Sequence, residues 1–360
     1  MTGLQAFEFE RLEYLESGMG LEIASPVTGR PILYLPVSVR RSLCAKTYVV
    51  IVALISLVIA AVTFIFLART LMTEYEDKAW KKQVIPTAFG VITSAQIFVM
   101  NMVYDRVARA LNDYENHRTQ SEYDNALILK TVLFQFVNSY SSLVYIAFIK
   151  PFVHEECVGG SNGRDCIAEL STQLGSIFGF GLVVSNVQEV GIPAFNNYMA
   201  NDAARVVKRS KSGNEENKKE KDEDEDEYLV ELTALEEQFV LEDYSIEKTL
   251  FEDYLELMVQ FGYATLFSAA YPLAPLLAMV NNYVELRVDA WKLCQQTRRA
   301  EAVSAETIGT WQLIVEVMST LAVQVALTKR RITTHEKKER ERERERATIR
   351  AKERERGSAF

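Results

Sequence analysis

The sequence predicts an all-α polytopic membrane protein, and three observations support this prediction. Apolar and charged residues are segregated into blocks, although the chain of 360 residues, 48% hydrophobic and 25% charged, has the average composition of a soluble protein. Residues 47–68 contain no Lys or Arg, whereas residues 208–227 are almost entirely polar. Several apolar stretches also reach the length of about 20 residues that a helix needs to cross a bilayer.

Composition also excludes several classes of protein. Three His and four Cys are too few for a His-rich metal enzyme or a disulfide scaffold. The net charge of -9 argues against a partner that is a nucleic acid. The sequence contains no P-loop, dinucleotide fingerprint, nucleophile elbow or paired CxxC, so we expect no hydrolytic or redox enzyme.

The first membrane span is the stretch 48–68, YVVIVALISLVIAAVTFIFLA. Its Val, Ile and Leu content would also suit buried strands. Its length without a charge or a turn residue favours a membrane helix. The stretch begins too far into the chain for a signal peptide and has no small-residue cleavage site nearby.

Further apolar stretches predict about six or seven spans in total. The later candidates are 85–104, 126–148, 167–192, 254–271, 273–293 and, as the weakest because it includes a Glu, 308–327. Most of them contain amide, hydroxyl or charged side chains. Because polar groups are costly in lipid, these side chains should face one another or a wet cavity. A transporter, a channel or a lipid pathway would need such polar stripes, whereas a single-pass anchor would not.

The spans and the charged blocks divide the chain into six segments. Arg40, Arg41 and Lys46 precede the first span, which predicts a cytoplasmic amino terminus for this multi-pass protein. The stretch 210–227, SKSGNEENKKEKDEDEDE, is low in complexity and should be disordered, either as a solvated spacer or as a regulatory or partner-binding tract. The carboxyl-terminal stretch 329–356 repeats Glu and Arg, which predicts an exposed helix or a disordered tail of alternating charge. Because its Lys and Arg outnumber its Glu, attraction to anionic lipid is the alternative. The segments are 1–46 (cytosolic), 47–195 (spans one to four), 196–249 (charged, largely disordered cytosolic loop), 250–300 (spans five and six), 301–328 (partial last span) and 329–360 (Glu/Arg-rich tail).

Five acidic residues lie at the cytoplasmic ends of three spans. They are Glu189 on the fourth span, Asp253 and Glu256 on the fifth, and Glu285 and Asp289 on the sixth. Spacings of three and four put each pair on one helix face. Because five carboxylates in one pocket would repel one another, we expect hard oxygen-binding cations there, namely two Ca²⁺ ions. Asn186, Ser185 and Asn282 could add neutral oxygens. Alternatively, Asp253 and Glu285 are interfacial and pair with Lys248 and Arg287.

Several other residues give weaker signals. Cys157 and Cys166 flank a small outer loop and predict an extracytoplasmic disulfide, while Cys44 and Cys294 are expected to be free. His117 and His154 fall in loops, where we expect surface positions. The run 138–142, NSYSS, either hydrogen-bonds neighbouring helices or lines a hydrophilic path.

Six motifs together resemble the anoctamin family. They are FEFE (7–10), ENHRTQSEYDN (115–125), KTVLFQFVNSYSSLVYIAF (130–148), VQEVGIP (187–193), EDYLELMVQFGYATLF (252–267) and YPLAPLLAMVNNYVELRVDAWK (271–292). The last two are highly specific for that family.

The resemblance implies a dimeric, calcium-activated membrane protein with ten spans. Some members are chloride channels and many scramble phospholipids. The family's two-calcium site lies on its sixth, seventh and eighth spans, and it matches the five acids named above, with Ser185 or Asn186 as a loose match for a neutral ligand. The family's lipid groove matches the stretches 85–104, 126–148 and 167–192. Bound calcium would draw the helix that carries Glu189 towards the other four acids, and this movement would open the groove. Expected lining residues are Thr93, Gln96, Asn138, Ser141 and Tyr145.

The departures from the family pattern concern both ends. The family's amino-terminal domain and first two spans should precede this chain, and the match stops near Val325, so the dimer-forming tenth span is in doubt. We interpret the chain as a truncated gene model or as a short isoform.

The leading functional hypothesis is calcium-activated phospholipid scrambling, with or without ion conduction. The alternatives are a calcium-activated channel for chloride or other small ions, and a membrane tether or a non-transporting regulatory fragment. Lys130 is the only clear basic residue in the spans, which favours lipid over anions. Residence in the plasma membrane or in the endoplasmic reticulum is not distinguished.

Overall fold

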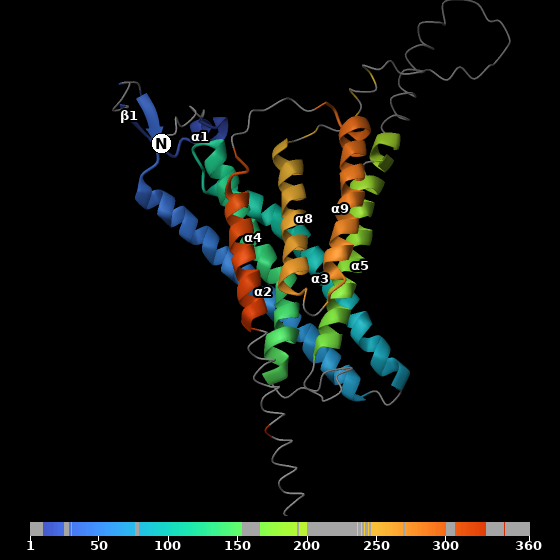
Figure 1. The fold of residues 1–360 in the computed structure, drawn as a ribbon. Coiled ribbons are helices and arrows are strands. Elements are labelled where there is room, and N and C mark those ends of the chain that lie inside the picture. Colours follow the sequence, from blue (N-terminus) through green and yellow to red (C-terminus); the bar gives the residue numbers. More distant parts are fainter. Residues whose placement is uncertain are drawn as a thin grey trace, which may run out of the picture.

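The computed structural model describes residues 10–24, 29, 31–75, 79–152, 166–192, 194–199, 236, 239, 241, 244, 246–268, 271–299, 307–328 and 342. It is a bundle of long helices with a small amino-terminal unit at one end (Figure 1). The predicted all-α fold class is confirmed. The predicted outer Cys157 and His154, most of the charged loop and nearly all of the tail lie outside the described residues.

The helices follow the order in which the apolar stretches occur. The amino-terminal unit comprises α1 (Leu12–Glu16), β1 (Leu21–Ala24) and β2 (Pro31–Tyr34). The bundle comprises α2 (Val37–Tyr75), α3 (Ala79–Tyr114), α4 (Gln120–Val144), α5 (Ile167–Asn186), α8 (Ile246–Leu266), α9 (Ala274–Trp291) and a last helix, Thr310–Thr328. Short π-helices extend three of them: η1 (Tyr145–Ile149) after α4, η3 (Val187–Gly191) after α5 and η4 (Lys292–Gln296) after α9, while the 3-10 turn η2 (Lys150–Phe152) follows η1.

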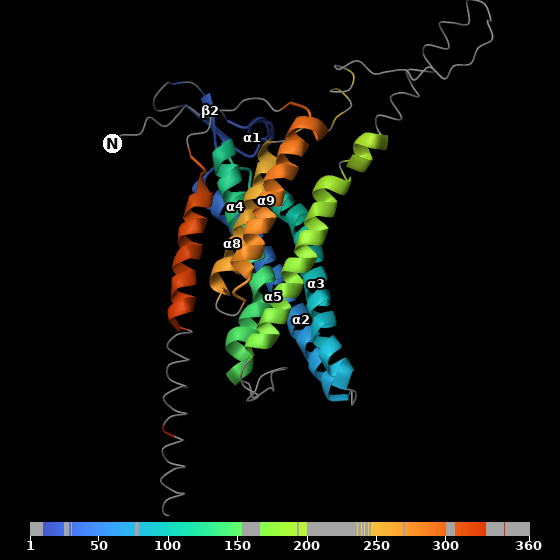
Figure 2. The same cartoon turned by 45° about the vertical axis from the view of Figure 1, so that its right-hand side comes forward.

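Within the described residues, four helices are long and apolar enough to cross a membrane. They are Val37–Thr73, Val84–Tyr114, Gln120–Ile149 and Thr310–Thr328. The other three predicted spans correspond to α5, α8 and α9, which run alongside them (Figure 2). The first helix begins 11 residues before the expected start at Tyr48. The physical reason is that hydropathy marks only the lipid-exposed part of a helix, whereas backbone hydrogen bonding continues through its polar ends.

Local sequence signals set the start and the course of two helices. Thr119 caps α4 by accepting a hydrogen bond from the backbone N–H of Glu122, at 3.3 Å. The Thr119 hydroxyl thereby satisfies a backbone donor that the helix itself cannot, while the Glu122 carboxylate accepts from Arg40. Pro86 lies inside α3, where it removes one backbone hydrogen bond near the start of the apolar stretch.

The core forms where aromatic side chains of neighbouring helices meet. Tyr104 of α3 and Phe134 of α4 stack with ring centroids 3.8 Å apart. Tyr140 of α4 donates a hydrogen bond to the backbone carbonyl of Val259 on α8, at 2.9 Å. This contact requires Gly262, because a β-carbon there would overlap the Tyr140 hydroxyl. Trp311 holds the last helix against α8 by stacking on Tyr254, with ring centroids 5.5 Å apart.

Candidate functional site

The acid-bearing ends of three helices lie at the same end of the bundle. α5 ends, α8 begins and α9 ends at the end of the bundle where the amino-terminal unit also lies, with α5 on the side away from that unit (Figures 1 and 2). α9 packs against both α8 and α5. The backbone therefore brings Asp253 and Glu256 of α8 near the level of Glu285 and Asp289 of α9. All four side chains are half-buried.

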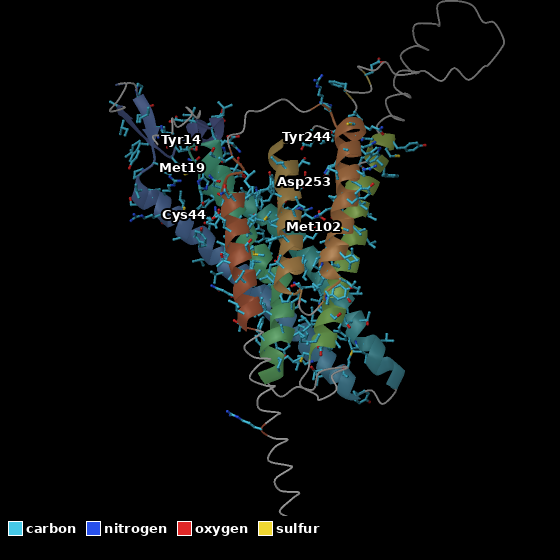
Figure 3. The ribbon with its side chains drawn as sticks, viewed as in Figure 1. Tyr14, Met19, Cys44, Met102, Tyr244 and Asp253 are labelled. Atoms are coloured by element: carbon cyan, nitrogen blue, oxygen red, sulfur yellow. The ribbon has the colours of Figure 1, made fainter. Side chains whose placement is uncertain are left out.

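The hydroxyl of Tyr244, which precedes α8, lies close enough to acids of both α8 and α9 for their charges to shift its pKa. Burial raises the pKa of Tyr244, and the carboxylates of Asp253 and Asp289 raise this pKa further, whereas the ammonium of Lys292 lowers it. Lys292 Nζ lies 4.0 Å from Asp253 Oδ1. Figure 3 shows Tyr244 above Asp253 at this end of α8. Asp253, Asp289 and Lys292 therefore share one electrostatic neighbourhood.

The alternative pairing would join Asp253 to Lys248 and Glu285 to Arg287. The side chain of Lys248 lies outside the described residues. Arg287 donates a hydrogen bond to the Tyr283 hydroxyl, at 3.0 Å, and covers that ring from the exposed side of α9. The described cation at Asp253 is Lys292, one turn beyond Asp289 on the same helix.

The end of α5 is a π-helix that contains Glu189. Single π-turns inside α-helices are frequent at functional sites. Beyond this turn, Asn197 donates hydrogen bonds to the backbone carbonyl and the side-chain oxygen of Gln296, at 2.9 and 2.8 Å, and so ties the chain after α5 to η4. The side chains of Glu189 and of the predicted neutral ligand Asn186 lie outside the described residues.

The donor chemistry of this end fits a hard divalent cation. The predicted ligands on α8 and α9 are all carboxylates, and Ca²⁺ binds 6–8 such oxygens. Within the described side chains, no group of three His, Cys, Asp or Glu is already close enough to hold a metal ion. Any site that these four acids form therefore needs the Glu189 helix, a rearrangement of the helix ends, or both.

A second feature is a polar layer between α3 and α4. The Asn138 side chain is fully buried and donates hydrogen bonds to the Ile97 carbonyl, at 2.9 Å, and to Asn101 Oδ1, at 2.7 Å. Gln96 Nε2 donates to Asn138 Oδ1, at 3.0 Å. Of the two readings of the run 138–142, hydrogen bonding between helices thus describes Asn138.

The other predicted lining residues differ in whether their polar atoms have hydrogen-bond partners. Thr93 is buried and bonds to its own helix, at the Phe89 carbonyl. Tyr145 opens the π-helix η1 and packs on Phe66, with ring centroids 4.7 Å apart. Several buried atoms on α3, α4 and α5 have no hydrogen-bond partner among the described residues, among them Oε1 of the predicted lining residue Gln96, the hydroxyls of Thr131, Ser141 and Ser142, and Nε2 of Gln173. Such groups normally find water or another polar partner, since leaving one unpaired costs about 1–3 kcal/mol.

The polar interior is closed on one side by direct packing of α3 on α5. Gly90 of α3 faces Ser176 of α5, and a β-carbon at Gly90 would lie 2.7 Å from Ser176 Oγ. The same β-carbon would lie 3.5 Å from Gln173 Oε1. Glycine at this position therefore permits the close approach of the two helices.

The expectation of a surface position for His117 was wrong, because this side chain is only 4% exposed. Its Nε2 lies 3.0 Å from Glu115 Oε2, which also accepts a hydrogen bond from Lys130 Nζ, at 2.6 Å. Thr47 donates to the other carboxylate oxygen, and Asn112 accepts from Lys130 Nζ, at 2.8 Å. The available signal was Lys130 itself, since a lysine inside an apolar helix requires an acidic partner.

These contacts make Glu115 a strongly acidic group. Burial by itself would raise the pKa of this carboxyl, but the hydrogen bonds from His117, Lys130 and Thr47 outweigh burial and lower the pKa to about 2. We refer to Thr47, Asn112, Glu115, His117 and Lys130 as the Glu115 network. It joins α2, α3 and α4 where the loop between α3 and α4 begins.

A second ion cluster, also missed from the sequence, lies at the opposite end of the bundle. The Glu169 carboxylate of α5 forms two ion pairs. Its Oε1 lies 2.9 Å from an Arg69 guanidinium nitrogen on α2, and its Oε2 lies 3.0 Å from Lys150 Nζ on η2. All three side chains are nearly inaccessible. Nearby, Cys166 is disulfide-bonded, while Cys44 and Cys294 are free thiols. The predicted partner, Cys157, lies outside the described residues.

Comparison with known proteins places these features in a family. The family model described as "Anoctamin: Calcium-activated chloride channel" matches residues 2–345. Anoctamin-7 of Homo sapiens is 33% identical over 320 residues, covering 83% of this chain and 32% of that protein. Human Anoctamin-3 is 32% identical over 326 residues, covering 84% and 31%. Human Anoctamin-5 is 38% identical over 246 residues, covering 63% and 24%. The chain thus spans about a third of the length of the first of these relatives.

Proposed function

Because the chain belongs to the anoctamin family, we propose that it moves phospholipids between the two leaflets of a membrane in response to calcium. The family and the apolar helices together make it an integral, multi-pass membrane protein. The polar interior of α3, α4 and α5 is the proposed path for lipid headgroups. The acids at the ends of α5, α8 and α9 are the proposed calcium site.

The observation that supports a lipid path is the set of buried polar groups in this interior. Ser141, Ser142 and Gln173 each present a polar atom that has no hydrogen-bond partner among the described residues. A zwitterionic headgroup with its hydration water could satisfy such groups, and they would lower the cost of its passage through the apolar bundle.

The buried cations near this path are neutralised by carboxylates. Lys130 is paired with Glu115, and Arg69 and Lys150 share Glu169. A path for free anions gains from fixed positive charge along its wall. The pairing of these cations supports lipid as the main cargo.

The proposed calcium ligands are Asp253, Glu256, Glu285 and Asp289, completed by Glu189 and Asn186. Bound calcium would supply positive charge that offsets the mutual repulsion of these carboxylates. The residues themselves would hold the ends of α5, α8 and α9 together. Because α5 also packs on α3 at Gly90, a shift of α5 towards α9 would loosen the contact that closes the polar interior.

The test measures lipid movement by the purified chain in vesicles that contain a fluorescent phospholipid. We expect a membrane-impermeant reductant to bleach lipid of both leaflets when calcium is present, and only the outer leaflet when a chelator is present. If calcium leaves the bleached fraction unchanged, the proposal is wrong.

A pair of glycine variants tests the path itself. Gly90→Val wedges α3 from α5 and should increase flipping without calcium, whereas Gly179→Val on α5, where a β-carbon meets nothing within 4 Å, should not.

Chloride conduction is the second candidate, because the printed description of the matching family names a chloride channel. Chloride efflux from the same vesicles distinguishes the two functions. Calcium-dependent efflux without lipid movement would favour the channel. Lipid movement with or without accompanying ion leak would support the scramblase.

A further inference from the structure

The ribbon of β1 and β2 is anchored to the protein through Leu33 on one face, and its other face is apolar. In the antiparallel register, Leu21 lies opposite Tyr34, Ile23 opposite Ile32 and Glu22 opposite Leu33. Residues directly opposite one another share a face of the ribbon, and successive residues alternate between faces. The four side chains Leu21, Ile23, Ile32 and Tyr34 therefore form one continuous apolar face, which we call the ribbon face.

The opposite side of the ribbon is the one fixed to the protein. Leu33 packs against the small core of Tyr14, Leu35 and Leu43, and the Tyr14 hydroxyl donates a hydrogen bond to the Leu33 carbonyl, at 3.2 Å. This anchoring sets the direction of the ribbon face. Leu21 remains 61% exposed, Tyr34 41% and Ile23 39%, while Ile32 is half-buried.

The ribbon face adjoins the polar first turns of the helix that carries the predicted first span, whose apolar stretch begins at Tyr48. Only Leu35 and Pro36 separate β2 from α2, so Tyr34 lies within about 10 Å of the start of that helix, at about 3.3 Å per residue. α2 is the most apolar of the candidate spans, and 22% of its most apolar window is buried. Its first turn adds the exposed Val37 and Val39 to the apolar surface.

Charge next to the ribbon face favours an anionic lipid surface as its partner. Arg41 and Lys46 are exposed on the first turns of α2. Arg40 is committed to Glu122 of α4, at 3.1 Å. Basic side chains beside an apolar face are typical of segments that lie in the membrane interface, where each cation near an anionic surface adds to binding. The ribbon's own acid, Glu22, lies on the opposite face.

We propose that the ribbon face lies flat on the membrane leaflet at which α2 begins, with Leu21, Ile23, Ile32 and Tyr34 inserted among anionic headgroups. The ribbon thereby acts as an interfacial anchor that holds the amino-terminal unit against the bilayer. This contact is independent of lipid flipping and of calcium.

The experiment compares a probe on the ribbon face with a probe on the opposite face. Cys44→Ser and Cys294→Ser remove the free thiols, and Ile23→Cys or Glu22→Cys adds one site for an environment-sensitive fluorophore. The labelled chain is placed in vesicles of phosphatidylcholine and phosphatidylserine. We expect lipids that carry a nitroxide near the headgroup to quench the probe at position 23 several-fold more than the probe at position 22. Aqueous iodide should show the opposite preference.

Each alternative result overturns the proposal. If iodide quenches both positions equally, the ribbon face is in water. If position 23 is shielded from iodide and from the nitroxide lipids, another protein surface covers it. A second arm varies the charge: Arg41→Gln together with Lys46→Gln should reduce lipid quenching at position 23 in vesicles that contain phosphatidylserine. An unchanged signal there would exclude the anionic headgroups as the partner.

Discussion

The Glu115 network and the acids of α8 and α9 lie towards the same end of the bundle, but their carboxylates differ in burial and in the donors that surround them. Glu115 is 2% exposed, and fixed donors from His117, Lys130 and Thr47 surround it. Asp253 is 28% exposed, and the described ion pair with Lys292 spans 4.0 Å. Asp289 adds a second negative charge to the same neighbourhood.

This difference separates a structural carboxylate from a candidate regulatory one. A carboxylate that protein donors already satisfy gains little from a metal ion, and its loss leaves buried charges unpaired. Half-buried acids grouped at one level repel one another, so a soluble cation can stabilise them. The Glu115 network should therefore determine stability, whereas the α8 and α9 acids should determine the response to calcium.

The largest effect is expected from breaking the Glu115 network. Lys130→Met leaves Glu115 buried beside a neutral side chain, which should lower the free energy of unfolding by about 3–5 kcal/mol. Thermal unfolding in detergent, with and without calcium, measures the loss, and the loss should be the same in both. The double variant Lys130→Met with Glu115→Leu should recover part of it. Additive losses would show that the two side chains do not act as a pair.

A somewhat smaller effect should follow from pH. The pKa of Glu115 falls from an ordinary 4.5 to about 2 in the folded protein. As pH is lowered, the unfolded chain therefore takes up a proton at Glu115 at a higher pH than the folded chain does. The stabilisation is thus complete above about pH 5 and is lost as pH falls towards 2, by up to about 3 kcal/mol. Melting temperatures between pH 7 and pH 3 should fall less steeply for Glu115→Gln than for the unsubstituted chain. Parallel curves would assign acid lability to other groups.

Substitution of the acids of α8 and α9 should change the response to calcium and should not lower stability in its absence. Asp253→Asn together with Asp289→Asn should raise the calcium concentration that gives half-maximal thermal stabilisation by at least about tenfold, equivalent to about 1.4 kcal/mol. Stability without calcium should stay constant or increase, because like charges are removed. Glu252→Gln is the matched control, since Glu252 adjoins Asp253 but is 52% exposed and pairs with Arg109 at 3.6 Å. Equal calcium shifts in the control and the double variant would refute a specific site.

The smallest effect is expected from an ion pair at the surface. Arg40 and Glu122 lie 3.1 Å apart, but their side chains are 43% and 41% exposed. Because water screens such pairs, Arg40→Gln should cost less than about 1 kcal/mol. A loss in thermal stability that matches that of Lys130→Met would mean that burial is not what separates the two kinds of site.

The candidate site could be read from the sequence to the extent that it depends on residues of one helix. The spacing of Asp253 and Glu256, and of Glu285 and Asp289, fixes each pair on one face, and both helices carry their pair near the expected end. The fate of His117 could not be read, because a loop position gives no information on which helices close over it. Lys130 was recognised as a charge inside a span, but its partner, 15 residues earlier, was not.

The sequence by itself determined that long apolar helices run in a fixed order, that acids cluster at the ends of three of them, and that the family is the anoctamins. Hydropathy and helix periodicity are local properties, and the bilayer allows few other solutions for such stretches. Only the tertiary structure decided that Glu169 holds both Arg69 and Lys150, that Gly90 brings α3 onto α5, and that the ribbon turns an apolar face outward. These contacts join residues that are distant in sequence, and their energies depend on distance and burial, which no local pattern encodes.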